Sequence, residues 1–141
     1  MSCASFEDAV ARHHDALVAF MRRDTQLFKD LYSRREDATL ANPFGGIARG
    51  WQEIPARLDR VALHYEDGEV VGIDTISSDH SGDIGYCVEI EHVRGRVGSR
   101  DTIDEFGART TSVFRCEDGA WRLVHRHADT AVELRAPESI I

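Results

Sequence analysis

The sequence predicts an α+β fold, in which three N-terminal helices pack on the concave face of a curved, mainly antiparallel sheet to form a cone. Apolar residues recur at three- and four-residue spacing from Phe6 to about residue 64, which is typical of amphipathic helices. From Glu69 onward they alternate with polar residues, which is typical of strands that bury one face. Helices that precede the long strands in this way indicate segregated layers rather than alternating units.

Three helices are predicted in the first half of the chain. The first spans about residues 5–22, with Ser5 as its N-cap. The second begins after Asp24, a second capping residue, and ends at residues 33–37. The third runs from Trp51 to about residue 64 and places Pro55 in or near its first turn, where a proline is tolerated.

The remaining elements are strands. A short strand is predicted at 38–41, and the Asn42-Pro43 segment after it starts a loop, because Pro43 lacks an amide donor and keeps Asn42 out of helical conformation. Four longer strands follow, at about 69–77, 83–94, 101–116 and 119–133. We expect a single domain over residues 1–141, with its core at about 6–132 and a tail at 133–141.

The last two strands flank Asp118-Gly119, a strong signal for a two-residue hairpin turn. Pairing across this turn places four pairs on one face: Cys116 with Trp121, Phe114 with Leu123, Ser112 with His125, and Thr110 with His127. A preceding turn centred near Gly98 would bring Tyr86 beside Thr110 on that same face. The opposite, outer face would then carry four arginines and two glutamates: Arg109, Arg115, Arg122, Arg126, Glu89 and Glu91.

The composition excludes several classes of partner. With 141 residues and a formal net charge of −8, the chain is not expected to bind nucleic acid. No apolar run approaches the ~18 residues that cross a membrane, and the first residues lack the pattern of a signal peptide. The three cysteines, Cys3, Cys87 and Cys116, have no metal-ligand spacing and favour a reducing cytoplasm over a disulfide framework. We therefore expect a cytoplasmic protein without nucleic-acid or membrane partners.

The order of elements and two motifs resemble a known family. The segment Asp-Ala-Thr-Leu-Ala-Asn-Pro-Phe-Gly at 37–45 and the closing segment from Asp-Gly-Ala-Trp to His-Arg-His-Ala-Asp resemble the SnoaL-like, ketosteroid-isomerase-like branch of the nuclear-transport-factor-2-like superfamily. The resemblance covers about residues 6–132. It implies a cone-shaped fold with a deep pocket, commonly in a homodimer packed sheet to sheet. The closing segment also resembles the association domain of calcium/calmodulin-dependent kinase, which is an oligomerisation module.

The residues that match the catalytic positions of ketosteroid isomerases have lost that chemistry. The proton-shuttling aspartate of those enzymes corresponds to Asn42, the first-helix tyrosine to Ala16 and the second acid to Ser112. An amide cannot accept a proton at neutral pH, so the resemblance does not imply a steroid-isomerase mechanism for this chain.

The candidate site residues are those that the predicted faces turn toward the pocket. His127, Tyr86 and His13 are the candidate catalytic residues, because a histidine with a pKa of about 6.5 can act as acid and base in a dehydration or isomerisation. The candidate substrate-binding residues are Asn42, Phe44, Trp51, Thr110, Ser112, His125 and Phe20. The plainer alternative makes His125 a core residue bonded to Ser112, and the large apolar residues ordinary core. Two imidazoles without a further ligand do not indicate a metal site, and no cofactor is implied.

Two functions remain open. The first is a small-molecule enzyme of the cyclase, isomerase or dehydratase type, which uses histidine acid–base chemistry on an apolar ligand. The second is a non-catalytic dimeric association or ligand-binding module, a homodimer formed through the outer sheet face and its arginines. The sequence favours a small-molecule pocket and leaves catalysis undecided.

Overall fold

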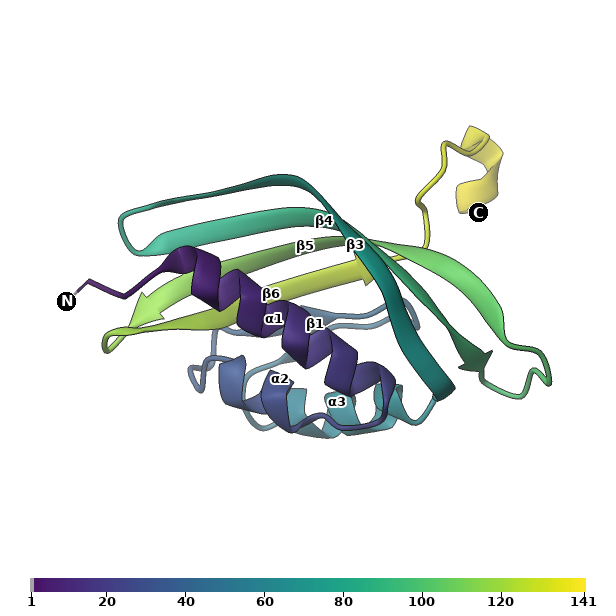
Figure 1. Ribbon diagram of the computed structural model, residues 1–141, viewed down its shortest axis with the longest axis horizontal. Coiled ribbons are helices and arrows are strands. Elements are labelled where there is room, and N and C mark those ends of the chain that lie inside the picture. Colours follow the sequence, from purple (N-terminus) through teal and green to yellow (C-terminus); the bar gives the residue numbers. More distant parts are fainter. Residues whose placement is uncertain (1) are drawn as a thin grey trace.

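The computed structural model describes residues 2–141 and confirms the α+β class (Figure 1). Three α-helices precede the long strands, and a short 3-10 helix, η1 (Pro137–Ile140), lies near the C-terminus. The helices are α1 (Phe6–Met21), α2 (Gln26–Leu31) and α3 (Ile54–Ala62). The strands are β1 (Thr39–Ala41), β2 (Ala48–Arg49), β3 (Tyr65–Ser81), β4 (Ile84–Val97), β5 (Asp104–Glu117) and β6 (Ala120–Asp129).

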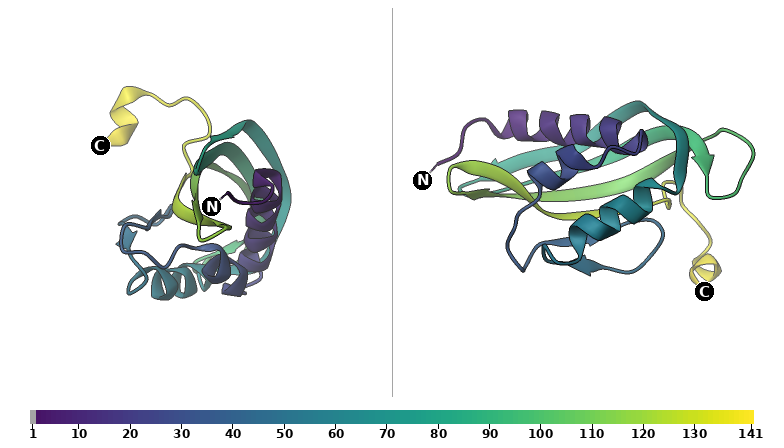
Figure 2. Two further views of the ribbon diagram at one scale, coloured as in Figure 1. Left: turned by 90° about the vertical axis from the view of Figure 1, so that its left-hand side faces the viewer. Right: turned by 90° about the horizontal axis from the view of Figure 1, so that it is seen from below.

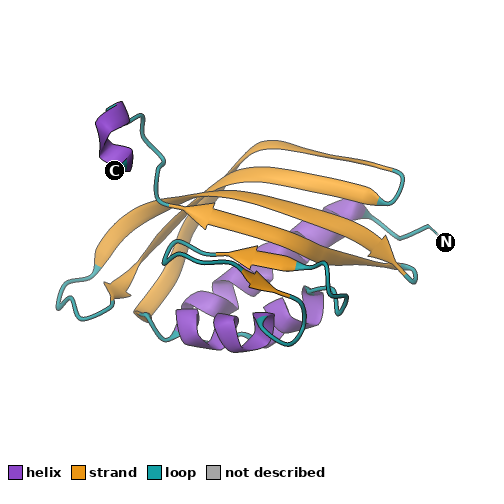
Figure 3. Cartoon of the chain, turned by 180° about the vertical axis from the view of Figure 1, so that it is seen from behind, coloured by secondary structure: helices purple, strands orange, loops and turns teal. Residues whose placement is uncertain are grey.

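The strands form one six-stranded sheet in the order β2-β1-β6-β5-β4-β3. Neighbouring strands are antiparallel except β1 and β6, which run parallel. The end-on view in Figure 2 shows the sheet curling around α1, and the view from behind in Figure 3 shows the strands in front of α1. The predicted packing of helices on the concave face is therefore confirmed, and the sheet gains β2, which the sequence pattern does not predict. Within residues 2–141, no helix is long and apolar enough to cross a membrane.

A capping residue or a proline lies at or next to the start of each α-helix. The Ser5 hydroxyl accepts a hydrogen bond of 3.2 Å from the Asp8 amide at the start of α1, which confirms the predicted N-cap. The Asp24 carboxylate accepts from the Gln26 amide at the start of α2, and Pro55 lies in the first turn of α3. On α1 the buried residues form one face: Phe6, Ala9, His13, Ala16, Leu17, Phe20 and Met21.

The core lies between α1 and the sheet, and its tightest contact is at Gly85. The Phe6 ring packs so closely over this glycine that a β-carbon there would lie 2.2 Å from the ring. The same ring makes edge-to-face contacts with Phe114 and Trp121, with ring centres 5.4 and 5.1 Å apart. The glycine in β4 is therefore required by the close approach of the helix.

The hairpin between β5 and β6 forms at the predicted turn. Asp118 and Gly119 both have left-handed backbone conformations, with φ of 52° and 82°. The two inward pairs nearest the turn have the predicted register: Cys116 with Trp121 and Phe114 with Leu123.

A β-bulge at Val124 ends that register. The pairing shifts by one residue on β6 between Leu123 and His125, and a shift of one residue exchanges the two faces of a strand. The prediction that His125 and His127 lie on the concave face is therefore wrong. The inward residues of β6 pair across β5 instead as Ser112 with Arg126 and Thr110 with Ala128.

A second register error exchanges the faces of β4. Tyr86 pairs with Val113, three residues from the predicted Thr110, because the loop between β4 and β5 is longer than a turn centred near Gly98. A shift by an odd number of residues exchanges the two faces of a strand, so Tyr86 lies on the outer face, where its side chain is exposed. The same shift turns Glu89 and Glu91 inward, where both are buried. The predictions that Tyr86 faces the pocket and that the two glutamates lie outside are therefore wrong.

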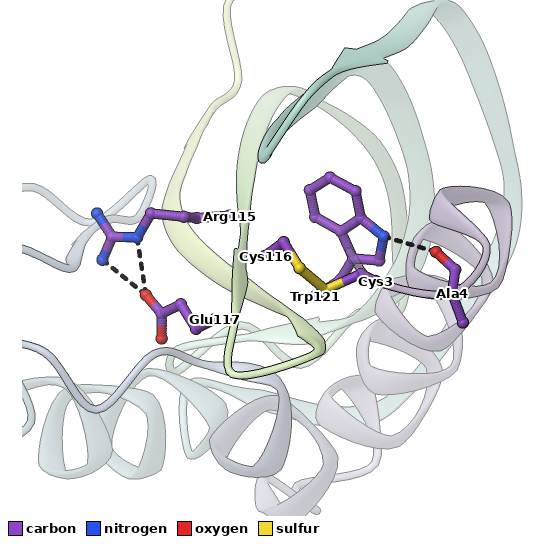
Figure 4. Close-up of a disulfide and its surroundings, with 6 residues drawn as sticks. All are labelled: Cys3, Ala4, Arg115, Cys116, Glu117 and Trp121. Atoms are coloured by element: carbon purple, nitrogen blue, oxygen red, sulfur yellow. Dashed lines mark hydrogen bonds and ion pairs between the residues drawn. A yellow bond between two sulfur atoms is a disulfide. The ribbon is translucent and has the colours of Figure 1, made fainter. Parts of the chain in front are cut away.

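A disulfide between Cys3 and Cys116 joins the N-terminal segment to β5, with the Cα atoms 5.8 Å apart (Figure 4). Beside it, the Trp121 indole donates a hydrogen bond of 2.9 Å to the Ala4 carbonyl. The expectation of reduced cysteines is wrong for this pair, whereas Cys87 is free and buried. The cytoplasmic location inferred from the cysteines loses that support and stays a prediction.

Candidate functional site

A mainly apolar cavity of about 50 Å³ lies between the helices and the concave face of the sheet. Side chains from α1, α2 and α3 form its helical side, and residues of β1, β3, β4, β5 and β6 form its sheet side. Four polar residues line it: Asn42, Tyr65, Glu91 and Arg126.

The centre of its polar wall is a buried ion pair between Glu91 and Arg126. Two parallel hydrogen bonds of 2.7 Å join the guanidinium to both carboxylate oxygens, and the two side chains are 2% and 9% exposed. Burial alone would lower the pKa of Arg126, but the neighbouring Glu91 outweighs it and the pKa is raised. Both partners reach the concave face only because of the register of β4 and the bulge in β6.

His13 supports this pair from behind. Its side chain is fully buried on α1, and its Nε2 lies 3.1 Å from Nη1 of Arg126. Since a guanidinium can only donate hydrogen bonds, Nε2 must accept, and the ring is neutral with its proton on Nδ1. Burial, and then the charge of Arg126, holds the pKa of His13 well below its ordinary value. His13 thus orients Arg126 rather than lining the cavity.

A second buried carboxylate, Glu89, ties α1 to the sheet. It accepts hydrogen bonds from Nε2 of His14 at 2.7 Å and from the Thr75 hydroxyl at 2.8 Å. Burial opposes the charge of Glu89, but these hydrogen bonds prevail and its pKa is lowered. The hydrogen bond to Glu89 in turn raises the pKa of the half-buried His14. Their pairing therefore favours a protonated His14 on the helix beside an ionised Glu89 on the sheet.

His13, Cys87 and Glu89 place ligand atoms within 4.8 Å of one another, a spacing that a metal ion could bridge. The hydrogen bond from Arg126 argues against this use of the cluster. It leaves the proton of His13 on Nδ1, the nitrogen that lies 3.9 Å from Glu89, so no lone pair is available there. We therefore assign these groups to the hydrogen-bonded interior.

The other two polar residues of the cavity offer hydrogen-bond donors. Asn42 accepts a hydrogen bond from the Phe44 amide at 3.1 Å through Oδ1, while its Nδ2 is buried without a hydrogen-bond partner among the described residues. Burial raises the pKa of Tyr65 to about 12, so its hydroxyl stays protonated at neutral pH.

Half of the ten residues predicted for the site lie in or next to this cavity. Phe20 and Asn42 line it. His13, Thr110 and Ser112 are buried behind its wall, where the Thr110 hydroxyl donates to the Glu89 carbonyl and the Ser112 hydroxyl lies 3.3 Å from Nε2 of His13.

The other five do not line the cavity. Phe44 lies on the loop after β1, half exposed, and Trp51 lies beneath a guanidinium at the molecular surface. Tyr86, His125 and His127 lie on the outer face. Their nearest polar partners are the Ser77 hydroxyl for Tyr86 at 2.9 Å, the Thr39 hydroxyl for His125 at 2.8 Å, and the Asp129 carboxylate for His127 at 3.6 Å.

Sequence reasoning missed Glu91, Arg126 and Tyr65. In β4 apolar and acidic residues alternate, which favours burial of the apolar face, but the structure buries the face of Glu91 instead; no local signal marks the bulge beside Arg126 either. Tyr65 precedes the predicted start of its strand at residue 69, whereas β3 begins at Tyr65 itself. Only the pairing of strands reveals these three residues as neighbours.

Three solved structures share the fold. A nuclear-transport-factor-2-like protein from Salmonella enterica serovar Typhimurium is 16% identical with a TM-score of 0.74, covering 93% of this chain and 92% of the other. A hexachlorocyclohexane dehydrochlorinase from Novosphingobium barchaimii is 15% identical with a TM-score of 0.74, covering 93% and 94%. A ketosteroid isomerase-like protein from Erwinia carotovora is 16% identical with a TM-score of 0.68, covering 89% and 95%. At these identities the likeness shows the fold alone.

The sequence itself matches a family model. Among curated proteins no match was found. The model of the SnoaL-like domain matches residues 8–133, most of the chain and all of the elements that build the cavity. The protein therefore belongs to the SnoaL-like family.

Proposed function

We propose that the protein binds a small, apolar molecule in the cone and acts on it by proton transfer, as an isomerase or lyase. The observation that carries this proposal is the Glu91–Arg126 ion pair in the wall of an otherwise mainly apolar cavity. Replacing a buried ion pair by apolar residues is often neutral or stabilising, so stability alone does not account for such a pair. A role in stabilising the charge that develops during a reaction would account for it.

Glu91 and Arg126 have complementary roles in this proposal. A carboxylate has about four lone-pair positions, and Arg126 occupies two of those on Glu91. Glu91 can therefore accept a proton from the ligand while Arg126, whose charge is permanent, stabilises the negative charge left behind. His13 keeps the guanidinium in place from behind.

This assignment replaces the histidine mechanism expected from the sequence. His127 and Tyr86 lie on the outer face, away from the cavity, so neither can reach a ligand in it. The fold neighbours include a dehydrochlorinase and an isomerase-like protein, and both kinds of reaction involve removal of a proton from carbon. The proposed reaction class agrees with them, and no cofactor is needed for it.

The experiment is a thermal-shift screen of small uncharged apolar compounds, followed by analysis of each hit for conversion to product. A ligand at 100 times its Kd adds about 2.7 kcal/mol of stability. Hits should bind wild type but not Ala108→Leu, which fills the cavity from β5. Glu91→Gln should retain binding and lose turnover. The matched control is Glu89→Gln, which alters a buried carboxylate of the same strand that does not line the cavity and should still turn over.

Two results would contradict the proposal. Hits that bind Ala108→Leu as tightly as wild type would show that they bind elsewhere. Equal turnover by Glu91→Gln and wild type would remove Glu91 from the reaction.

A dimeric binding module remains the second candidate, and the outer sheet face favours it. Ile84 and Tyr86 are 48% and 38% exposed there, although Arg126, one of the arginines expected on this face, is buried. We propose a homodimer through this face. Light scattering should give the mass of a dimer for wild type and of a monomer for Ile84→Glu. Ile47→Glu, which changes an exposed apolar residue on the loop before β2, is the control. A dimer that survives Ile84→Glu would exclude this interface.

A further inference from the structure

We propose that the ligand of the cavity is uncharged and carries a hydrogen-bond acceptor of the carbonyl type, which the side-chain amide of Asn42 binds. This inference rests on the proposed function, because it requires that the cavity binds a small molecule. It follows from three properties of the cavity: its charge balance, its unpaired donor and its volume.

The charges of the cavity wall are already balanced. Arg126 and Glu91 neutralise each other through both carboxylate oxygens, and no other lining residue carries a charge. An ionic ligand would bring a charge without a free partner into a mainly apolar space, which is strongly unfavourable. An uncharged molecule is therefore the ligand that this wall accepts.

The unpaired donor is the amide nitrogen of Asn42. More than nine-tenths of buried polar groups in proteins have a hydrogen-bond partner, so an exception calls for an explanation. The orientation of this amide is set by the Phe44 amide, which donates to Oδ1 and leaves Nδ2 as the end without a partner. A ligand oxygen that accepts from Nδ2 would give this nitrogen the hydrogen-bond partner that it lacks. Alcohol, ether and carbonyl oxygens can all accept, but an alcohol brings a donor of its own, and an ether oxygen is flanked by two carbons, whereas a carbonyl oxygen projects from the ligand and presents two lone pairs.

The cavity offers a second donor at Tyr65. Tyr65 lines the same space, and its hydroxyl, which stays protonated at neutral pH, can donate a hydrogen bond. Asn42 and Tyr65 can therefore both donate, while each oxygen of Glu91 already accepts from Arg126 and keeps only its remaining lone pairs for the proposed proton transfer. The polar wall is thus complementary to an acceptor on the ligand.

The volume limits the size of the ligand. A cavity of about 150 Å³ lined by apolar side chains can hold benzene. The present cavity is about 50 Å³, a third of that volume, so a molecule with the volume of benzene or of a four-carbon ketone enters it only by displacing the partly exposed Phe106 at its wall. Small probes are therefore the right test of the class.

The experiment compares two probes that have nearly the same shape, 2-butanone and 2-methyl-1-butene, in which a carbonyl oxygen is replaced by a methylene group. Dissociation constants are measured by NMR titration of wild type and of Asn42→Leu, with Asn42→Ala as a second variant in case the leucine prevents folding. We expect wild type to prefer the ketone. Loss of the donor should weaken ketone binding at least tenfold and change alkene binding less than twofold. Xenon, which enters apolar cavities without hydrogen bonds, reports on the cavity itself.

The outcomes separate this inference from the proposed function. If xenon or the alkene binds but the ketone binds no better, or if Asn42→Leu weakens both probes equally, the ligand class is wrong while the cavity stands. Binding of the propionate anion as tight as that of 2-butanone would likewise refute an uncharged ligand. If none of the probes nor xenon binds, the cavity is no ligand site, and both this inference and the proposed function fall.

Discussion

The buried pair of Glu91 and Arg126 makes the sharpest prediction about stability. Removing one partner leaves the other charge buried without compensation, which typically costs about 3–5 kcal/mol. For a domain of ~150 residues, 1 kcal/mol moves the Tm by roughly 2–4 °C, so a single variant should lower the Tm by about 6–20 °C. Glu91→Leu should have the larger effect at neutral pH, because the guanidinium left behind cannot lose its charge. The carboxylate left by Arg126→Met can take up a proton instead.

The assay is urea unfolding of four proteins: wild type, Glu91→Leu, Arg126→Met and the double variant. Since apolar side chains often replace a buried ion pair with little loss, the double variant should be more stable than either single variant. The reasoning would be refuted if the losses of the single variants simply add in the double variant, because the two charges would then not depend on each other. Single variants with unchanged midpoints would refute it as well.

Three further predictions concern other parts of the fold. Cys116→Ser breaks a disulfide of sequence separation 113 with Cys3 and should cost about 2–4 kcal/mol in urea unfolding, a loss that reductant should reproduce in wild type and not in the variant. The raised pKa of His14 and the lowered pKa of Glu89 predict that their pair stabilises most between the ordinary pKa values, 4.5 and 6.5. The His14 contribution is present in full below pH 6.5 and is lost as the pH rises through its raised pKa, so the stability difference between wild type and His14→Gln should shrink there; a difference that grows would contradict the pair. Gly85→Ala places a β-carbon 2.2 Å from an aromatic ring of α1 and should cost about 1–3 kcal/mol, and an unchanged Tm would show that α1 can move aside.

Local chemistry was enough to predict most of the elements. The Ser5 cap, the position of Pro55 and the turn at Asp118 and Gly119 each depend on a few adjacent residues, and the structure confirms all three. The two-residue strand β2 has no such signal, because it exists only by pairing with β1.

The site was harder to predict than the fold, because it depends on which face of each strand is buried, and a shift of one residue in strand pairing changes that face. Two shifts of register, one at the loop before β5 and one at Val124, each moved a set of polar residues to the other face. As a result, Glu89 took the position beside Thr110 that the sequence pattern assigns to Tyr86, and Arg126 took the position opposite Ser112 that it assigns to His125. The histidine that does matter for the cavity, His13, lies on a helix whose buried face was predicted correctly.

The sequence by itself determined the α+β class and the order of the elements, because helix and strand periodicity and turn chemistry are properties of neighbouring residues. Its motifs resembled the SnoaL-like family, which the family model confirms. Only the tertiary structure decided which polar groups meet. Arg126 contacts His13 and Glu91 across sequence separations of 113 and 35, and Cys3 reaches Cys116 across 113. Such contacts depend on the register of every strand between them, and a displacement of one residue anywhere along that path reverses which side chains enter the cavity.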